Sequence, residues 1–458
     1  MPNIWFNWAI KNKANIMWAM ASVAALSALA IYNGYPLVFF DSGTYIRQVL
    51  RLEGALDRPP FYSFFLLFVH LKLSLWPVPI VQNIIVVTLA FRALSLAFPE
   101  LKPANVFRVI ILAAVTTTLP WFSNQVMPDI FTPLIVLSVF CIVVGWTQVG
   151  KAEKVALSVS LCAMCSFHTA SPVFAAIIAA GAVIVAYSGQ LVKREAVIAT
   201  VGAVLMAMVA QTLYTYTVTK RISPSAYTPV FLLGRLIGDG SARRFLAVAC
   251  PTQQYVLCSR QGELTDDTDF FLWDPRSPLS DVFRQLGTSG ALDEAAAIVR
   301  GTVTSFPRSV VTDAVLNSLR QFTSVVPTNE CPCLTGTKIN DVVAEFFPNE
   351  FLAFSNSGQN TRTLPVVKIA QADIIILVLS VVFIGAIVLI KPDVLRGHAW
   401  RLLMLISLGT VVNAALMGAL SSVADRYQAR LIWLVPLFAY ALLFSGRVGT
   451  KDRKRIVR

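Results

Sequence analysis

Charged residues are scarce in this sequence, at 14% of its 458 residues, whereas a soluble globular chain has roughly 25%. Hydrophobic residues make up 56% of the chain. This composition excludes an ordinary soluble globular protein. It predicts an all-α polytopic membrane protein.

Nucleotide-binding motifs are also missing. The sequence has no Walker loop and no convincing GxGxxG pattern, the two glycine-rich motifs that hold nucleotide phosphates. It has no DxD motif at Asp41 or Asp129, the acidic positions described below, and it contains only three histidines. We therefore expect no cofactor and no metal ion.

The net charge of +13 has a simple explanation in membrane topology. Lysine and arginine lie mostly in short connections and in the C-terminal stretch RVGTKDRKRIVR. A nucleic-acid-binding protein would instead gather them on one basic face with interleaved aromatic residues. The lipid bilayer is therefore an expected partner, and nucleic acid is not.

Ten apolar segments are predicted to be membrane spans, each of which needs about 20 residues. They cover residues 14–40, 78–98, 106–121, 127–147, 153–168, 172–189, 195–218, 368–390, 400–420 and 429–446. The first is longer than the core of a signal peptide and has no small-residue cleavage site after it, so we expect an uncleaved helix.

The segment 60–77, PFYSFFLLFVHLKLSLWP, decides the orientation of the chain. It is apolar, but it is short and contains His70 and Lys72. If it lies along the outer face as a juxtamembrane helix, the loops rich in lysine and arginine all fall on one side, as the positive-inside rule requires. If it crossed, the basic tail would lie outside. We therefore predict a multi-pass protein of the plasma membrane (the bacterial inner membrane) with about 10 transmembrane helices and both termini in the cytoplasm.

This topology divides the chain into four parts. They are an N-terminal membrane module at 1–219 with its outer loop at 41–77, an extracytoplasmic soluble insertion at 220–365, C-terminal membrane helices at 366–446 and a basic cytoplasmic tail at 447–458. The insertion contains FFLWDPRSPL, whose Trp273 and Asp274 are expected to cap a cavity or to dock a partner.

Four of the seven cysteines lie in the insertion, where an oxidising compartment permits disulfides. We favour a bridge between Cys250 and Cys258, because Cys331 and Cys333 would close a very small, strained ring. Cross-linking between the two pairs remains an alternative. A zinc site is a weaker interpretation, because the spacing is unusual and the insertion has no histidine.

Asp41, in FFDSGTYI, is placed where the first span reaches the outer face. It has two competing interpretations. It is either a helix terminus or N-cap in ordinary turn chemistry, or a carboxylate at the mouth of a membrane cavity that accepts a proton from an attacking hydroxyl.

Further charged residues collect on the same predicted face. Asp129, in NQVMPDIF, is either an N-cap with a favourable helix-dipole interaction or a second functional acid. Asp57 and Arg58, in GALDRPPFY, add a charged pair. His168, in CSFHTASP, is either a satisfied boundary residue or part of the same cavity.

The sequence DRYQAR lies directly before the last span. One interpretation is a salt bridge between Asp425 and Arg430, or arginines that extend toward lipid headgroups. The other is that Arg426, beside Tyr427, binds a phosphate or diphosphate of a lipid carrier, because a planar guanidinium matches phosphate oxygens.

These motifs together resemble the GT-C superfamily of integral membrane glycosyltransferases, which includes protein O-mannosyltransferases and the aminoarabinose transferase of lipid A. The similar features are an outer aspartate with a nearby tyrosine (Asp41 and Tyr45), the segment RPPFYSFFLLFVHLKLSLW, a second acid in a Pro-Asp pair (Asp129), and RY before an apolar span. The resemblance covers about 18–220 and 370–446. Many relatives have paired acids where this chain has Asp-Ser.

The resemblance implies a polyprenyl-phosphate sugar donor, an extracytoplasmic active site and catalytic roles for Asp41 and Asp129. The acceptor would be an unspecified glycan, lipid or protein of the cell envelope. The implied reaction is a displacement at the anomeric carbon. Asp41 would take the proton of the acceptor hydroxyl, and Arg426 with Arg58 would stabilise the leaving phosphate.

Three other classes of protein compete with this interpretation. A transporter typically has broken spans and charges at the membrane midplane, whereas the charges here lie at the outer boundary. A membrane acyltransferase would normally need a histidine inside an apolar span. A non-catalytic envelope assembly protein built around the insertion is the third alternative.

Overall fold

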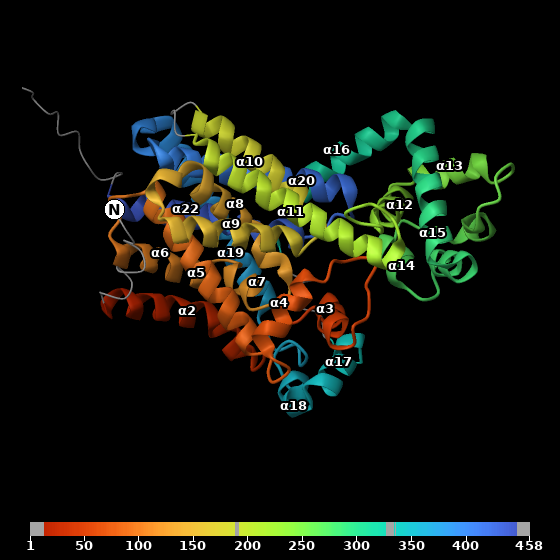
Figure 1. Ribbon diagram of the computed structural model, residues 1–458, viewed down its shortest axis with the longest axis horizontal. Helices are drawn as coiled ribbons and strands as arrows, with labels where there is room; N and C mark the ends of the chain where they lie inside the picture. Colours follow the sequence, from red (N-terminus) through yellow and green to blue (C-terminus); the bar gives the residue numbers. More distant parts are fainter. Residues whose placement is uncertain (1–12, 188–191, 327–333, 335, 447–458) are drawn as a thin grey trace, which may run out of the picture.

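The computed structural model describes residues 13–187, 192–326, 334 and 336–446, and these residues form helices without strands (Figure 1). One isolated parallel bridge joins Leu37 to Gln125. The structure confirms the predicted all-helical fold.

The helices are given in chain order. Before the insertion they are α2 (Lys13–Asn33), α3 (Phe40–Leu50), α4 (Phe61–His70), α5 (Pro77–Ala97), α6 (Pro103–Thr116), α7 (Leu119–Ser123), η1 (Pro128–Ile130), α8 (Phe131–Val139), η2 (Phe140–Val144), η3 (Trp146–Gln148), α9 (Lys151–Ser166), α10 (Ser171–Tyr187) and α11 (Arg194–Thr219). In the insertion they are α12 (Thr228–Gly238), α13 (Ser241–Ala249), η4 (Val256–Glu263), α14 (Thr268–Trp273), α15 (Pro278–Ser305), α16 (Pro307–Thr323), α17 (Lys338–Phe346), η5 (Pro348–Glu350) and α18 (Phe351–Ser355). After it come α19 (Val366–Ile390), η6 (Pro392–Leu395), α20 (His398–Leu420), α21 (Arg426–Ile432) and α22 (Leu434–Phe444).

Six helices in the described part of the chain are long and apolar enough to cross a membrane. They are α2, α5, α11, α19, α20 and the continuous stretch of α21 and α22. These helices support a multi-pass membrane protein. The remaining predicted spans correspond to shorter elements: α6 has 14 residues, α9 has 16 and α10 has 17, and the segment 127–147 is divided between η1, α8 and η2. The count of ten spans therefore stays a prediction.

The first span ends earlier than the sequence predicts. Helix α2 stops at Asn33, and Gly34 follows with φ +78°, a left-handed conformation that commonly terminates helices. The chain then runs extended beside Asn124 to Val126, and Val126 N–H donates to Leu37 O at 2.8 Å. The residues after the break, YPLVFF, are as apolar as the helix, so no signal in the sequence marks it. The predicted span 14–40 was therefore wrong at its outer end. Asp41 consequently belongs to a new helix, α3.

The centre of the bundle is the segment 117–145, in which every residue is buried. It contains α7, η1, α8 and the π-helical turn η2, and its neighbours include α5, α9, α10 and α20. The segment is mostly apolar, but it also buries polar side chains such as Asn124 and Gln125. This position puts Asp129 in the interior of the protein.

Helix α4 is too short to cross a bilayer. Its ten residues span about 15 Å, roughly half of the hydrocarbon thickness. Leu71 and Lys72 follow with positive φ values of 49° and 59°, which end the helix. The juxtamembrane placement of the segment 60–77 stays a prediction.

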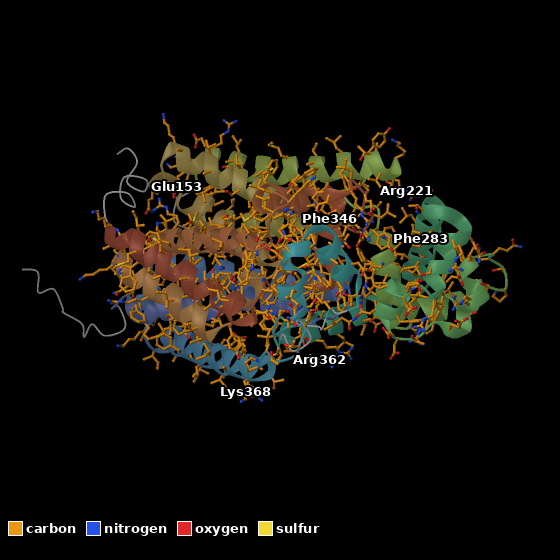
Figure 2. The ribbon with its side chains drawn as sticks, turned by 90° about the horizontal axis from the view of Figure 1, so that it is seen from below. Glu153, Arg221, Phe283, Phe346, Arg362 and Lys368 are labelled. Atoms are coloured by element: carbon orange, nitrogen blue, oxygen red, sulfur yellow. A yellow bond between two sulfur atoms is a disulfide. The ribbon has the colours of Figure 1, made fainter. Side chains whose placement is uncertain are left out.

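The insertion packs in two places. Residues of α12 to α15 form their own hydrophobic cluster at the opposite end of the long axis from α6 and α22 (Figure 1). Figure 2 shows Phe283 of this lobe at one end of the molecule and Glu153 toward the other. Helices α17 and α18, by contrast, join the main core through residues such as Ile339 and Phe354. The insertion therefore combines a separate lobe with a return segment packed against the bundle.

A disulfide joins Cys250 to Cys258, which confirms the favoured pair. It links the end of α13 to η4 within the lobe. Cys331 and Cys333 lie outside the described residues. Two other cysteines, Cys141 and Cys165, are buried free thiols in the bundle.

Candidate functional site

Helix α3 is fixed at its N-terminus to the buried centre of the bundle. Ser42 Oγ accepts from Phe39 N–H at 2.9 Å and donates to Val126 O at 2.8 Å. Gln359, in the return segment, donates to Val38 O and accepts from Val38 N–H. Because these bonds hold both sides of the α3 start, the position of Asp41 in the first turn is well defined.

Asp41 contacts an arginine with each carboxylate oxygen. Its Oδ1 lies 3.1 Å from Arg58 Nη1, and its Oδ2 lies 3.6 Å from Arg426 Nη2. Asp41 lies in the first turn of α3, which agrees with a helix terminus, but the N-cap is Phe39, so the interpretation of Asp41 as the N-cap was wrong. Its side chain is 31% exposed. Asp41 is therefore the solvent-accessible acid between two guanidinium groups.

Arg58 reaches Asp41 from a loop that two polar side chains hold. Tyr214 of α11 bonds both the N–H and the carbonyl of Ala55 through its hydroxyl at 2.9 Å. Gln48 donates to Arg58 O and to Tyr214 Oη. The Arg58 guanidinium lies 5.2 Å from the centre of the Tyr45 ring and also pairs with Asp57. The loop is thereby fixed with its cation above α3.

Charge and burial set the ionisation of the groups around Arg58. Burial alone would lower the pKa of Arg58, but the carboxylates of Asp41 and Asp57 outweigh it and raise the pKa. Burial raises the pKa of Tyr45 as well, against the opposing effect of Arg58. Tyr45 therefore remains a neutral phenol under Arg58.

Arg426 joins Asp41 to a second, deeper acid. Its Nη2 lies 3.7 Å from Asp129 Oδ2, while Arg430 Nη1 donates to Asp129 Oδ1 at 2.9 Å. The side chain of Asp129 is only 4% exposed, and that of Arg430 only 3%. Arg430 also donates to Asn413 of α20. Acids and arginines thus alternate in a series from Asp57 to Arg430, which is most exposed at Asp41 and almost fully buried at Arg430.

These contacts correct two expectations from the sequence. The N-cap of η1 is Met127, so Asp129 is no helix cap. Arg430 pairs with Asp129 and not with Asp425. Tyr427 instead contributes its ring, which lies 5.5 Å from the guanidinium of Arg426 and 5.3 Å from that of Arg430.

A cavity of about 1130 Å³ is lined by part of this series of acids and arginines. Asp41, Asp57, Arg58, Arg426 and Tyr427 line it, as the sequence predicts for a shared outer site. The other three candidate residues, which do not line it, are Tyr45, Asp129 and His168.

The three residues outside the cavity lie behind it. Tyr45 is 2% exposed under Arg58, and Asp129 is buried below Arg426. The imidazole of His168 accepts from Ala170 N–H through Nδ1 and interacts electrostatically with Arg430 and Asp129. They support the lining residues without facing the open space.

The sequence analysis missed part of the site. Tyr214 and Gln48 gave no signal, because a span residue that holds a distant loop looks like any polar residue in an apolar helix. Asp266, Asp267 and Asp269 form an acidic stretch, but only the fold places it in the lining of the same cavity as Asp41. Trp273 lines the cavity as expected, whereas Asp274 does not line it and pairs with Arg276.

The arrangement suits anion binding beside a carboxylate. Two guanidinium groups converge within about 4 Å of one accessible acid, and guanidinium groups match the oxygens of phosphates. Within the described residues, no group of three or more His, Cys, Asp or Glu side chains is placed to hold a metal ion. Searches against protein-family models, curated proteins and solved structures find no match for the chain.

Proposed function

We propose that this protein is a membrane glycosyltransferase that moves a sugar from a polyprenyl-phosphate carrier to an acceptor at the outer face of the membrane. One observation carries the proposal. Arg58 and Arg426 meet the two oxygens of Asp41 at the floor of a cavity of about 1130 Å³, beside helices long enough to cross a membrane. Such a site joins an anion-binding pair to a proton acceptor at the point where a lipid carrier would present its phosphate.

The contacts suggest how the donor and the acid share the arginines. Arg426 lies 3.6 Å from Asp41 and 3.7 Å from Asp129, and both distances are longer than those of strong charge-assisted hydrogen bonds. An arriving phosphate can take its place between Arg58 and Arg426. This exchange releases the carboxylate of Asp41 toward the cavity.

The reaction then proceeds as a displacement. The acceptor oxygen forms a bond to the anomeric carbon as the bond from that carbon to the phosphate oxygen breaks. Asp41 takes the hydroxyl proton, and the electron pair leaves with the polyprenyl phosphate, whose charge Arg58 and Arg426 stabilise. We assign Asp129 a positioning role, because it is buried beneath Arg426 and Arg430 and does not line the cavity.

The membrane arrangement belongs to the same proposal. Ten spans, both termini in the cytoplasm and an extracytoplasmic insertion would place the cavity at the outer face of the plasma membrane. The disulfide Cys250–Cys258 supports an oxidising location for the lobe. The juxtamembrane helix α4 would lie beside the site, because it packs against α3.

Purified protein in liposomes, supplied with a panel of radiolabelled polyprenyl-phosphate sugars and envelope extract, tests the proposal. We expect label to leave the carrier and appear on a glycan, lipid or protein. Absence of transfer from every donor, together with flux of a solute across the liposome membrane, would favour a transporter instead. Absence of both would favour an assembly protein.

A further inference from the structure

One wall of the cavity that Asp41 lines belongs to the insertion. It consists of the turn before α14 and the helix itself, with Asp266, Asp267, Asp269 and Trp273 among the lining residues. The reaction proposed above uses none of them. This wall therefore needs its own explanation.

Aromatic side chains on this wall are held from behind and open toward the cavity. The Trp273 ring is supported by Phe231, with ring centres 6.0 Å apart, yet 49% of Trp273 is exposed. Tyr227 also lines the cavity and packs on Phe231 at 5.1 Å and on Phe283 at 6.0 Å. A large exposed aromatic residue on a rigid support is typical of a binding surface.

The carboxylates beside Trp273 differ from other acids of the lobe. Arg260 pairs with Glu263 and Asp281, and Arg276 pairs with Asp274. Among the described residues, by contrast, no ion pair is formed by the carboxylates on the cavity wall, which are Asp266, Asp267 and Asp269. Asp267 accepts the N–H of Phe270 as the cap of α14. The carboxylates of Asp266 and Asp269 are therefore available to accept hydrogen bonds from a ligand in the cavity.

Asp269 also faces the catalytic cluster. Burial and the neighbouring Asp267 raise its pKa, and Arg426 and Asp41, which line the same cavity, both act on it electrostatically. A ligand held on this wall would therefore lie between α14 and the Asp41 carboxylate. That is the place of the acceptor in the reaction proposed above.

We propose that Trp273, with Asp266 and Asp269, forms an acceptor subsite that binds a sugar ring, so that the acceptor is a glycan. A sugar has an apolar face of C–H groups that packs on an aromatic ring, and hydroxyl groups at its edge that donate to carboxylates. The inference rests on the proposed glycosyltransferase function, because it assigns the second substrate of that same cavity.

Saturation-transfer NMR on the purified full chain tests the subsite without the need for a donor. The probes are short oligosaccharides of neutral and of amino sugars, offered separately. We expect transfer to ring C–H protons, with binding about tenfold weaker in Trp273→Ala and largely restored in Trp273→Phe. The control is Trp400→Ala, which removes an exposed tryptophan of α20 that does not line the cavity and should leave binding unchanged.

The outcomes separate this inference from the proposed function. Equal binding by the wild type and Trp273→Ala, or no binding of any sugar, overturns the subsite. If Asp41-dependent transfer to a lipid or peptide then persists, the glycosyltransferase proposal stands without a glycan acceptor. Sugar binding that depends on Trp273, without use of any polyprenyl-phosphate donor, would support the sugar site and overturn the proposed reaction.

Discussion

At the scale of single residues, Asp41 and Asp129 share one arginine but differ in their surroundings. Asp41 is 31% exposed and lines the cavity, whereas Asp129 is 4% exposed between Arg426 and Arg430. An acid that faces substrate can be replaced at little cost to folding. A buried acid that neutralises two buried cations cannot, because its loss leaves those charges without compensation.

Replacing each acid by asparagine should therefore separate folding from activity. Asp129→Asn should destabilise the protein by about 3 to 5 kcal/mol, and Asp41→Asn by about 1 kcal/mol or less. Thermal unfolding in detergent measures the difference. Asp393→Asn, which breaks an exposed pair with Arg396, serves as the control. Equal melting temperatures for Asp41→Asn and Asp129→Asn would contradict the positioning role of Asp129.

Tyr214 should act as a positioning residue for Arg58. Tyr214→Phe leaves the N–H of Ala55 without its partner and loosens the loop that carries Arg58. We expect kcat/KM for the donor to fall about tenfold, mainly through a higher KM, because the loop orients a binding group. Tyr216→Phe is the matched control, since Tyr216 lies on the same helix and is 47% exposed. An unchanged KM in Tyr214→Phe would refute this role.

At the scale of helices, two contacts decide how the parts around the site are held together. Helix α4 ends at His70, whose ring meets the edge of Phe347 with ring centres 5.3 Å apart. Helix α16 crosses α20 at Gly418, where an added Cβ would lie 2.6 Å from the backbone of Ser318. The first contact joins the juxtamembrane helix to the return segment, and the second joins the lobe to the bundle.

His70 makes the docking of α4 dependent on pH. Burial, with a smaller contribution from the charge of Lys72, lowers the pKa of His70 from 6.5 to about 4. Between these pH values the unfolded state binds a proton that the folded state does not, so stability is full above pH 6.5 and falls as the pH drops toward 4. In the wild type, Lys72 N–H donates a hydrogen bond to His70 Nδ1. His70→Asn removes the titrating ring but keeps a side-chain acceptor for this hydrogen bond. The variant should show a smaller fall in melting temperature between about pH 7 and pH 5, and an unaltered pH profile would argue against this docking.

Gly418 should tolerate no side chain. Gly418→Ala forces α16 away from α20 because the three nearest atoms are backbone atoms of Asn317 and Ser318, and we expect a loss of roughly 2 kcal/mol. Gly385→Ala in α19 meets nothing within 4 Å and should be neutral or slightly stabilising. Thermal unfolding of both variants compares the two sites. A stable Gly418→Ala protein would show that the close crossing is dispensable.

At the scale of the whole molecule, most of the correct predictions came from the composition of the sequence and from the distribution of its charges. Scarce charge indicated a helical membrane protein, and the positive-inside pattern brought Asp41, Asp129 and Arg426 to one face before any contact was known. The structure places Arg426 within 4 Å of both acids. The grouping of these three residues does not depend on exact helix ends, which is why it is found in the structure although the first span ends early, whereas the orientation of the chain stays a prediction.

The ion-pair partners of the site residues and their depth of burial could not be predicted from the sequence. The partner of Arg430 is Asp129, about 300 positions away in sequence, so local spacing pointed to Asp425 instead. The break at Gly34 was invisible because the residues after it are as apolar as the helix. The role of the insertion depended on the fold, since nothing local in the sequence says that Trp273 and Asp269 line one cavity with Asp41.

The central claim is that Asp41 carries the chemistry of a sugar transfer at this cavity. Its most direct test is the initial rate of transfer from radiolabelled polyprenyl-phosphate sugar in liposomes, measured for the wild type, Asp41→Asn and Asp425→Asn. Asp425 lines the same cavity without an ion pair among the described residues and is therefore the matched control. We predict a loss of at least about 100-fold in Asp41→Asn and little change in Asp425→Asn. Undiminished transfer by folded Asp41→Asn protein would contradict the account.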